Sequence, residues 1–342
     1  MNASLIFVGP NRRVTPLEVE SSRAGFKPIQ VSAFDFDDPY TAGKIKLFLE
    51  DTDQALFRFI YPFYDINYRR QVSSLVKSGE DMSTASFKIF EEMIRGWQEF
   101  IGSLGMKTVE VNPLETMLQQ RNKSFQYETM GPEGLIPPTI HLTSETPIER
   151  IEDMLRNTPG VVYKPVSGSQ SKGIFIVRQG PDGYSVMSDI KGDRPVNQVG
   201  DLSDLTRKLH HEGYVAQELI DYADLFGGND YDLRVHVLDG EVIGTAAFVY
   251  NRHTGEEEVH SIDAKAQEDP RLQATMEEAR RMSLRAAELF GLYDTGVDLM
   301  VSTDYKPLIT EVNCFPGWYM LQVNPDLDIA QKEVELYQRL LK

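Results

Sequence analysis

The first 120 residues alternate short apolar runs with stretches of helical periodicity. Residues 4–8 (SLIFV) predict a short buried strand, and apolar or alternating runs recur at 28–34, 55–61 and 107–111. Residues 83–105 place large apolar side chains three and four positions apart, which is typical of one helix face packed on a sheet. This alternation predicts a small parallel sheet with flanking helices.

Polar residues followed by proline indicate where helices begin. Thr15, Asn112 and Thr146 each precede a proline, and each predicts a helix N-terminus with a side-chain cap. Glu149 lies three residues after Thr146, which is the spacing of a capping box. Gly25 can end the first of these helices.

Beyond a Gly/Pro-rich connection at 131–139, most of the signals indicate strands. Asp239-Gly240 separates two apolar runs and predicts a hairpin with a type I′ turn. We expect strands at 160–165, 173–177, 214–220, 231–237, 241–250, 297–301 and 306–313, and helices at 146–157, near 201–210, at 271–290 and at 327–341.

Composition narrows the functional classes. Of the 342 residues, 41% are hydrophobic and 25% are charged, as in a globular protein, and the net charge is −17. This acidic balance argues against a nucleic-acid partner, although it is compatible with a local basic pocket for a small polyphosphate. Cys314 is the only cysteine and cannot form an intrachain disulfide, and no apolar run approaches the 18 residues of a membrane span. We therefore expect a cytoplasmic protein with no membrane partner.

A glycine- and serine-rich segment follows the strand at 160–165. Lys164 lies late in that strand, and Gly168 to Gly173 follow within the next nine residues. Glycines let backbone N–H groups converge on an anion, and a strand lysine adds a compact positive charge beside them. The pattern is typical of a phosphate site. The alternative interpretation is a flexible hairpin loop with a solvated lysine.

Three oxygen-bearing side chains lie near the C-terminus. Glu311 and Asn313 are two apart on one predicted strand and therefore share a face, and Asp298 lies on the other strand of the predicted hairpin. Hard oxygen ligands that converge in this way suit Mg²⁺. A polar strand face open to water is the alternative, but unpaired carboxylates are costly inside such apolar runs.

Asp232 and Arg234 share a strand face by the same two-residue period, downstream of the segment AQELI at 216–220. An arginine beside a metal and phosphate site would stabilise developing negative charge. The alternative is an ion pair between Asp232 and Arg234.

These elements, taken in order, resemble the ATP-grasp superfamily over Lys123 to Gly317. The segments that carry the resemblance are NKSFQYETM with IPPTI, VVYKPVSGSQSKGI, AQELI, YDLRVHVLDGEVIGTAA, and GLYDTGVDLMV with LITEVNCFPG. The last two look closest to the RimK-like and glutathione-synthetase-like branch. The resemblance implies an α/β fold with an α+β C-terminal part. It also implies an N-terminal parallel α/β domain at 1–118, a central lid subdomain at 119–216 and a metal-bearing subdomain at 217–342.

The resemblance also implies roles for single residues. Arg234 would face the reacting phosphoryl and acyl groups, and Asp232 would approach the ribose. Asp298, Glu311 and Asn313 would hold two Mg²⁺ ions, for which Mn²⁺ could substitute. The residues implied to contact ATP are Lys123, Lys164, Gly168, Ser169, Gln170, Gly173, Glu218 and Leu219.

The function implied is an ATP-dependent ligase that joins a small carboxylate to an amine, an amino acid or a peptide, through an acyl phosphate. Such chemistry needs positioning and charge neutralisation rather than a side-chain nucleophile, and no Ser-His or Cys-His arrangement stands out here. A small-molecule kinase of the same superfamily and a nucleotide-binding regulatory protein are the alternatives. A homo-oligomer is compatible with the sequence.

Several segments depart from the family pattern. The stretch at 221–230 is longer than expected, so Asp221 or Asp224 could replace Asp232 at the ribose. The Arg-Ser-Asn signature of RimK-like enzymes is absent where Arg252, His260, Ser261 and Lys265 lie. Cations or aromatic residues that could meet a substrate, or could be plain surface residues, are Arg12, Arg13, Arg69, Arg70, Trp318 and Tyr319.

Overall fold

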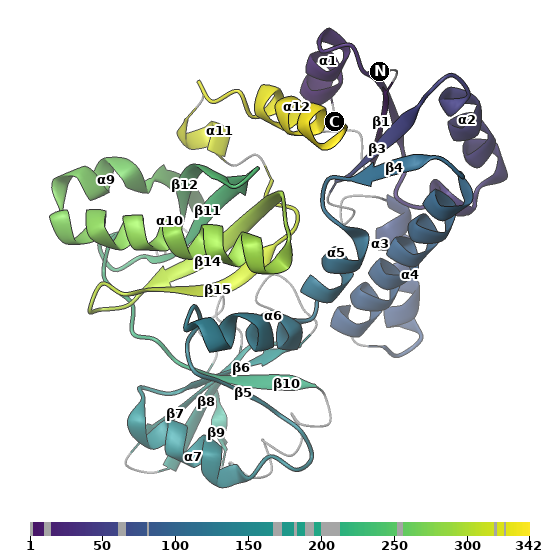
Figure 1. Ribbon diagram of the computed structural model, residues 1–342. Helices are drawn as coiled ribbons and strands as arrows, with labels where there is room; N and C mark the ends of the chain where they lie inside the picture. The colour runs from purple at the N-terminus through teal and green to yellow at the C-terminus, as the bar shows by residue number, and fades with distance from the viewer. Residues whose placement is uncertain are drawn as a thin grey trace.

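Three β-sheets organise the chain in the computed structural model (Figure 1). The structure describes residues 3–9, 15–60, 66–80, 82–166, 173–180, 183–188, 195–199, 213–251, 256–317, 320–324 and 326–342.

The N-terminal sheet is parallel and has the order β2-β1-β3-β4, as the alternating pattern predicts. Its strands are β1 (Ala3–Val8), β2 (Lys27–Val31), β3 (Gln54–Phe59) and β4 (Lys107–Glu110). The associated helices are α1 (Thr15–Arg23), the 3₁₀ turn η2 (Asp35–Asp37), α2 (Pro39–Leu49), α3 (Ile66–Lys77), α4 (Met82–Ser103) and α5 (Leu114–Gln120).

Helix α4 supplies the centre of the N-terminal core. Trp97 is fully buried and makes edge-on contacts with Phe59 and Phe100. Its indole N–H donates to the carbonyl of Ala33 at 2.8 Å, so the polar end of the ring is satisfied. The three-four spacing of apolar residues therefore reports a sheet-packed helix, as predicted.

The middle sheet is antiparallel at every pairing and has the order β5-β10-β6-β7-β8-β9. One helix, α7 (Ile148–Asn157), packs its buried Ile151 and Leu155 into the core of this sheet. The helix expected near 201–210 lies outside the described residues. The strands are β5 (Thr139–His141), β6 (Val161–Pro165), β7 (Phe175–Gly180), β8 (Gly183–Ser188), β9 (Pro195–Val199) and β10 (Tyr214–Glu218).

The C-terminal sheet has the order β13-β12-β11-β14-β15 and is also antiparallel. Asp239 and Gly240 have φ values of 54° and 76°, which is the left-handed pair that a type I′ turn requires. The strands are β11 (Asp230–Leu238), β12 (Glu241–Tyr250), β13 (Glu257–Ser261), β14 (Asp294–Val301) and β15 (Pro307–Asn313). The helices are α9 (Ile262–Glu268), α10 (Pro270–Phe290), α11 (Met320–Val323) and α12 (Ile329–Leu340).

Helix α6 (Lys123–Met130), followed by the turn η4 (Gly131–Glu133), lies between the middle and C-terminal sheets (Figure 1). The backbone N–H of Lys123 donates to the carbonyl of Val166, next to β6, at 2.7 Å. The amide of Gln126 donates to the carbonyl of Val312 on β15 and accepts from its N–H, at 3.1 and 2.9 Å. One short helix is thus fixed to both sheets.

The predicted side-chain cap at Asn112 is wrong. The Asn112 amide instead crosses to the C-terminal sheet, where it donates to the carbonyl of Asp294 at 2.7 Å and accepts from the N–H groups of Tyr293 and Asp294. Glu110 binds the first turn of α5 instead, because its carboxylate accepts a hydrogen bond from the N–H of Leu114 at 2.7 Å.

The predicted capping box at Thr146 is also wrong. Pro147 is the N-cap residue of α7, with no side-chain cap bond. The Thr146 hydroxyl belongs to the preceding turn, because it accepts from the N–H of Thr143 at 2.9 Å and reaches the carbonyl of His141 at 3.2 Å.

A buried ionic cluster joins the N-terminal sheet to the C-terminal part of the chain. Arg58 of β3 pairs with Asp294 of β14 and with Glu333 of α12, and its Nε–Oε2 distance to Glu333 is 3.3 Å. His236 Nε2 lies 2.7 Å from the second Asp294 oxygen, and the Tyr337 hydroxyl donates to Glu333 at 2.5 Å. All five side chains are buried, so the junction is held by charged and polar groups that lie away from bulk water.

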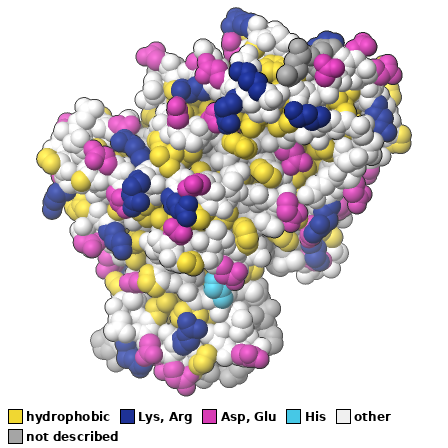
Figure 2. All heavy atoms as spheres, in the orientation of Figure 1, with side chains coloured by type: hydrophobic (Ala, Val, Ile, Leu, Met, Phe, Trp, Pro, Cys, Tyr) yellow, Lys and Arg dark blue, Asp and Glu magenta, His cyan; other side chains and the backbone are white. Residues whose placement is uncertain are grey.

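Acidic and basic side chains are interspersed over the face of the molecule in Figure 2, where the lobe of the six-stranded sheet projects below the rest. Within the described ranges, every helix is too short or too polar to cross a bilayer.

Candidate functional site

The residues that sequence reasoning singled out come together where the middle and C-terminal sheets meet around α6. Lys164 comes from β6, Lys123 from the first turn of α6, and Arg234, Asp298 and Glu311 from the C-terminal sheet. Electrostatic interactions link Lys164 with Lys123 and Glu311, and Glu311 with Asp298. Five residues spread over 189 positions of sequence thus form one charged site.

Lys123 and Glu311 form the first contact of this site. Their Nζ–Oε1 distance is 2.9 Å, and the Lys123 side chain is only 10% exposed. Burial alone would raise the pKa of Glu311, but the charge and hydrogen bond of Lys123, together with the charges of Arg121 and Lys164, hold that pKa below its usual value. Glu311 is therefore a carboxylate at neutral pH, available to a cation.

Lys164 has a neutral partner. Its Nζ donates to the side-chain carbonyl of Gln217 on β10 at 2.6 Å and lies 5.9 Å from the centre of the Tyr127 ring. Burial, together with the positive charge of Lys123, lowers the pKa of Lys164 to about 8. An incoming anion would restore the ordinary basicity of this amine.

Arg234 forms an ion pair with Asp298. Residues 234 and 298 are opposite one another in the β11–β14 register. Arg234 Nε and Nη2 donate to the two Asp298 oxygens at 2.6 and 2.8 Å, and the guanidinium lies 5.2 Å from the centre of the Phe248 ring. The alternative of an Asp232–Arg234 pair on one strand does not describe this geometry.

The predicted metal ligands are adjacent. Asp298 is opposite Glu311 across β14 and β15, and the Asn313 amide donates to Asp298 at 2.8 Å. Burial raises the pKa of Asp298 although Arg234 opposes the shift, so a divalent cation would complete its charge balance. Two carboxylates and one amide oxygen are the hard donors that Mg²⁺ prefers, and the residues present fit that ion.

In the segment predicted to contact adenine, the backbone N–H groups of Glu218 and Leu219 are hydrogen-bonded to other parts of the protein. The N–H of Glu218 donates to the carbonyl of Pro138, and that of Leu219 to the carbonyl of Gly160, both at 2.9 Å. Burial raises the pKa of the Glu218 carboxyl. A contact between this segment and a base would therefore fall to carbonyl groups or side chains.

Asp232 has an exposed side chain on β11, and its charge acts on Lys164. Asp224 is committed to its own loop, because its carboxylate accepts from the N–H of Gly228 at 2.7 Å. Asp221 is exposed, and its backbone carbonyl accepts from Thr303. The interaction with Lys164 therefore favours Asp232 among the three candidates for the ribose.

Some predicted residues lie outside the part of the chain that the structure describes. They are Gly168, Ser169 and Gln170 of the glycine-rich segment, together with Arg12, Arg13, Arg252, Trp318 and Tyr319. Gly173 is described and has a φ of 72°, which favours glycine. A Cβ there would also come within 3.2 Å of the Tyr214 hydroxyl.

Sequence reasoning missed Gln217, Tyr127 and Arg121 as members of the site. The positive charge of Arg121 lowers the pKa of Glu311, and its guanidinium lies 5.6 Å from the centre of the Phe90 ring, which brings helix α4 to the edge of the site. Gln217 and Tyr127 are uncharged, so their residue types do not suggest a role in the site. Only their positions, Gln217 two residues from the partner of Lys164 on β10 and Tyr127 one helical turn after Lys123, could have predicted that they lie there.

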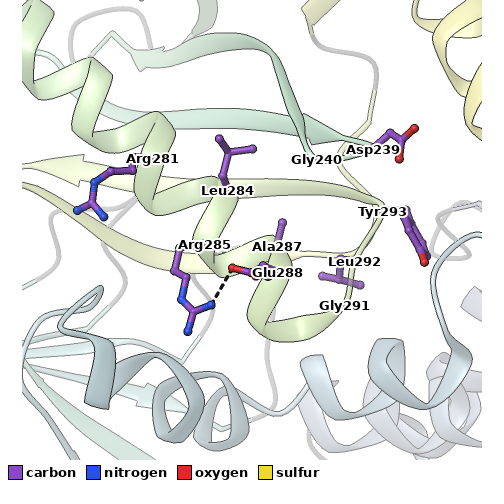
Figure 3. A pocket seen from close by; sticks show the side chains of 10 residues that line it. All are labelled: Asp239, Gly240, Arg281, Leu284, Arg285, Ala287, Glu288, Gly291, Leu292 and Tyr293. Atoms are coloured by element: carbon purple, nitrogen blue, oxygen red, sulfur yellow. Dashed lines mark hydrogen bonds and ion pairs between the residues drawn. The ribbon is translucent and has the colours of Figure 1, made fainter.

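Two cavities lie apart from these residues. One of about 670 Å³ is lined by Arg281, Leu284, Arg285, Tyr293 and the Asp239 turn (Figure 3). Its arginines are paired with acids, Arg281 with Glu278 at 2.5 Å and Arg285 with Glu288 at 2.7 Å. The other, of about 290 Å³, lies among the helices of the N-terminal sheet and includes Arg70 with Phe34 and Phe36.

Comparisons with known proteins identify the family and the fold of the chain. A family model described as YheC/D like ATP-grasp matches residues 122–342. The chain is 24% identical over 244 residues to a probable alpha-L-glutamate ligase of Xylella fastidiosa (strain M12), and the match covers 69% of each chain. It is 26% identical over 239 residues to a probable alpha-L-glutamate ligase of Trichodesmium erythraeum (strain IMS101), covering 69% of this chain and 70% of that one.

Solved structures share the fold. The ATP-grasp ligase PsnB, complexed with a phosphomimetic variant of its minimal precursor, Mg and ADP, superposes with a TM-score of 0.61 at 16% identity over 100% of both chains. The D-alanine–D-alanine ligase from Bacillus anthracis superposes with a TM-score of 0.55 at 14% identity, covering 99% of this chain and 97% of that one. The resemblance predicted from the order of motifs is confirmed.

Proposed function

We propose that this chain, which belongs to the YheC/D-like ATP-grasp family, is an ATP-dependent carbon–nitrogen ligase that joins a carboxylate to an amine through an acyl phosphate. The observation that carries the proposal is the convergence of Lys123, Lys164 and Arg234 with Asp298 and Glu311 around α6. This set combines fixed cations for phosphates with oxygen donors for a metal ion.

In the proposed reaction, a carboxylate oxygen of the donor attacks the γ-phosphorus of ATP, and the bond to the β-γ bridging oxygen breaks. ADP leaves, and the carboxyl group has become a mixed anhydride with phosphate. The amine then attacks the acyl carbon, loses a proton, and expels inorganic phosphate. Positioning and charge neutralisation account for such a reaction, without a covalent intermediate on the protein.

The chain's own cations have separate tasks in this proposal. Lys123 and Lys164 hold the phosphates from two different elements, so the polyphosphate is fixed between α6 and β6. Arg234 faces the oxygens on which negative charge grows in the transition state. Its two hydrogen bonds to Asp298 keep the guanidinium in one orientation. Preorganisation of this kind avoids rearrangement at the moment of reaction.

Asp298, Glu311 and Asn313 would hold Mg²⁺, which when bound neutralises phosphate charge and polarises the transferring group. Two ions, with Mn²⁺ as a substitute, belong to the same proposal. Because Arg234 contacts Asp298 and Lys123 contacts Glu311, a bound metal ion would share both carboxylates with these two cations.

The proposed substrates are an amino acid or a peptide on each side of the new bond. The named relatives include probable alpha-L-glutamate ligases, and PsnB is described with a precursor peptide. The test is ADP release by the purified protein with MgATP and a panel of amino acids and dipeptides. ADP release that needs both a carboxylate and an amine, with a condensed product by mass, supports the proposal. ADP release with an alcohol alone would indicate a kinase instead.

A further inference from the structure

The hydrogen-bonded chain behind Lys164 begins on the middle sheet. Lys164 Nζ donates to Gln217 Oε1 at 2.6 Å, Gln217 Nε2 donates to the Thr139 hydroxyl at 2.9 Å, and that hydroxyl donates to the carbonyl of Pro137 at 2.8 Å. Because Thr139 uses its proton on Pro137, it can only accept from Gln217. The amide is thereby fixed with its oxygen toward the ammonium group.

Gln217 is well placed to hold this orientation. Gln217 is 2% exposed. It lies two residues along β10 from the partner of Lys164 on β6, so the two side chains are diagonal neighbours on the same face of the sheet. A buried glutamine with both ends of its amide satisfied has little freedom to turn. The lysine therefore finds a rigid, uncharged acceptor.

The charged groups around Lys164 come from three other elements. Lys123 of α6 repels it, while Glu311 of β15 and Asp232 of β11 attract it, and the Tyr127 ring of α6 lies beside it. Glu311 makes its 2.9 Å contact with Lys123. Among the residues that the structure describes, no carboxylate forms an ion pair with Lys164.

We propose that Gln217 is the positioning residue for Lys164, and that its neutral amide leaves this lysine to complete its charge pairing with the nucleotide phosphates, with uptake of a proton from solvent. The inference rests on the proposed function, because it assigns the incoming anion to the phosphates of ATP. The lowered pKa of Lys164, about 8, agrees with the geometry. Above that pH, binding must restore the proton, so affinity falls by up to about tenfold per pH unit.

The test is calorimetric titration of the full chain with Mg²⁺ and AMP-PNP at pH 7, 8 and 9, in two buffers of different ionisation enthalpy. The wild-type protein should take up close to one proton at pH 9 and much less at pH 7. In Gln217→Glu the new carboxylate keeps Lys164 charged before the ligand arrives. That variant should bind about tenfold more weakly at pH 7 and lose the proton uptake.

A matched control adds the same charge elsewhere. Gln273→Glu lies on the exposed side of α10 and should keep the wild-type affinity and proton uptake. Gln217→Met keeps the length but removes the acceptor, so the fall in affinity should begin at a lower pH. This second variant tests the inference even where Gln217→Glu does not fold.

The inference is overturned by wild-type binding without proton uptake, or by Gln217 variants with the wild-type pH profile. A purely structural role for Gln217 would change thermal stability while leaving that profile in place. Failure of the wild-type protein to bind AMP-PNP at any of the three pH values would instead refute the proposed nucleotide site itself.

Discussion

Arg234 and Asp298 face each other across β11 and β14 and are joined by two hydrogen bonds of 2.6 and 2.8 Å. Asp298 also accepts from Asn313, so one carboxylate ties together an arginine and a predicted metal ligand. A planar guanidinium held by both oxygens of a carboxylate has a fixed direction. The Arg234 guanidinium is therefore oriented by Asp298.

Arg234→Lys keeps the positive charge but loses the second hydrogen bond and the fixed direction. We expect turnover to fall by about 10²–10³, the usual cost of losing one preorganised donor, with little change in ATP affinity. Steady-state kinetics with a separate nucleotide-binding measurement checks this. Arg280→Lys, whose partner Asp263 lies on α9, should leave turnover unchanged. Near-normal turnover in Arg234→Lys would mean that Arg234 only stabilises the strand pair.

Gly296 leaves room for the same guanidinium stem. A Cβ at this position would lie 3.1 Å from Arg234 Cδ and 3.2 Å from Pro316, which is too close unless one of them moves. Gly296→Ala should therefore reduce turnover by displacing Arg234. Gly43→Ala in α2 meets nothing within 4 Å, so it should keep activity and gain about 0.5–1 kcal/mol of stability. Equal kinetics for the two variants would contradict the predicted displacement.

Glu311→Gln removes the charge that Lys123 contacts and that a metal ion would share. Turnover should fall sharply, and the Mg²⁺ concentration needed for half-maximal ADP formation should rise. Glu257→Gln on the exposed edge strand β13 makes the same chemical change away from the site and should behave as wild type. A wild-type Mg²⁺ dependence in Glu311→Gln would remove Glu311 from the metal site.

The buried ionic cluster around Arg58 and Asp294 should make the free energy of unfolding depend on pH. Burial would raise the pKa of Asp294, but the charge of Arg58 and the hydrogen bond with His236 hold it below its usual value. Its contribution to stability is therefore present at neutral pH and is lost as the pH falls below about 4. Arg58→Met leaves a buried carboxylate without its main partner and should cost about 3–5 kcal/mol at pH 7.

Urea unfolding at pH 7 and pH 4.5 measures that cost. Because the pKa of Asp294 rises without Arg58, the variant should lose its penalty in part at the lower pH, where the carboxyl becomes protonated. Arg95→Met removes an exposed arginine that pairs with Glu91 and should change stability by less than about 1 kcal/mol. A penalty for Arg58→Met that does not depend on pH would argue against the charge of Asp294 as its cause.

Sequence reasoning succeeded where local periodicity dictates the structure. The helix at 82–103, the turn at Asp239-Gly240 and the shared face of Glu311 and Asn313 all follow from short-range spacing. The ordered motifs then placed Lys123 and Lys164 in the same site as Glu311, although about 150 to 190 residues separate these groups along the chain.

The failures concern side chains whose partners are distant in sequence. The sequence around Asn112 predicts a helix cap, yet its side-chain amide donates a hydrogen bond to the carbonyl of Asp294, 182 residues away. Arg58 gives no signal in its own strand, because its partners Asp294 and Glu333 lie 236 and 275 residues downstream. Only the packing of the N-terminal sheet against the C-terminal part of the chain reveals these roles.

The central claim is that the carboxylate substrate is activated as an acyl phosphate, and oxygen transfer measures it most directly. The carboxylate that supports ADP release, beginning with L-glutamate, is labelled with ¹⁸O in its carboxyl groups and incubated with MgATP, the amine and the enzyme. Mass spectrometry of the inorganic phosphate then reads the outcome. We predict that one ¹⁸O per turnover passes from the carboxylate to the phosphate, and phosphate without label, alongside normal product formation, would contradict the account.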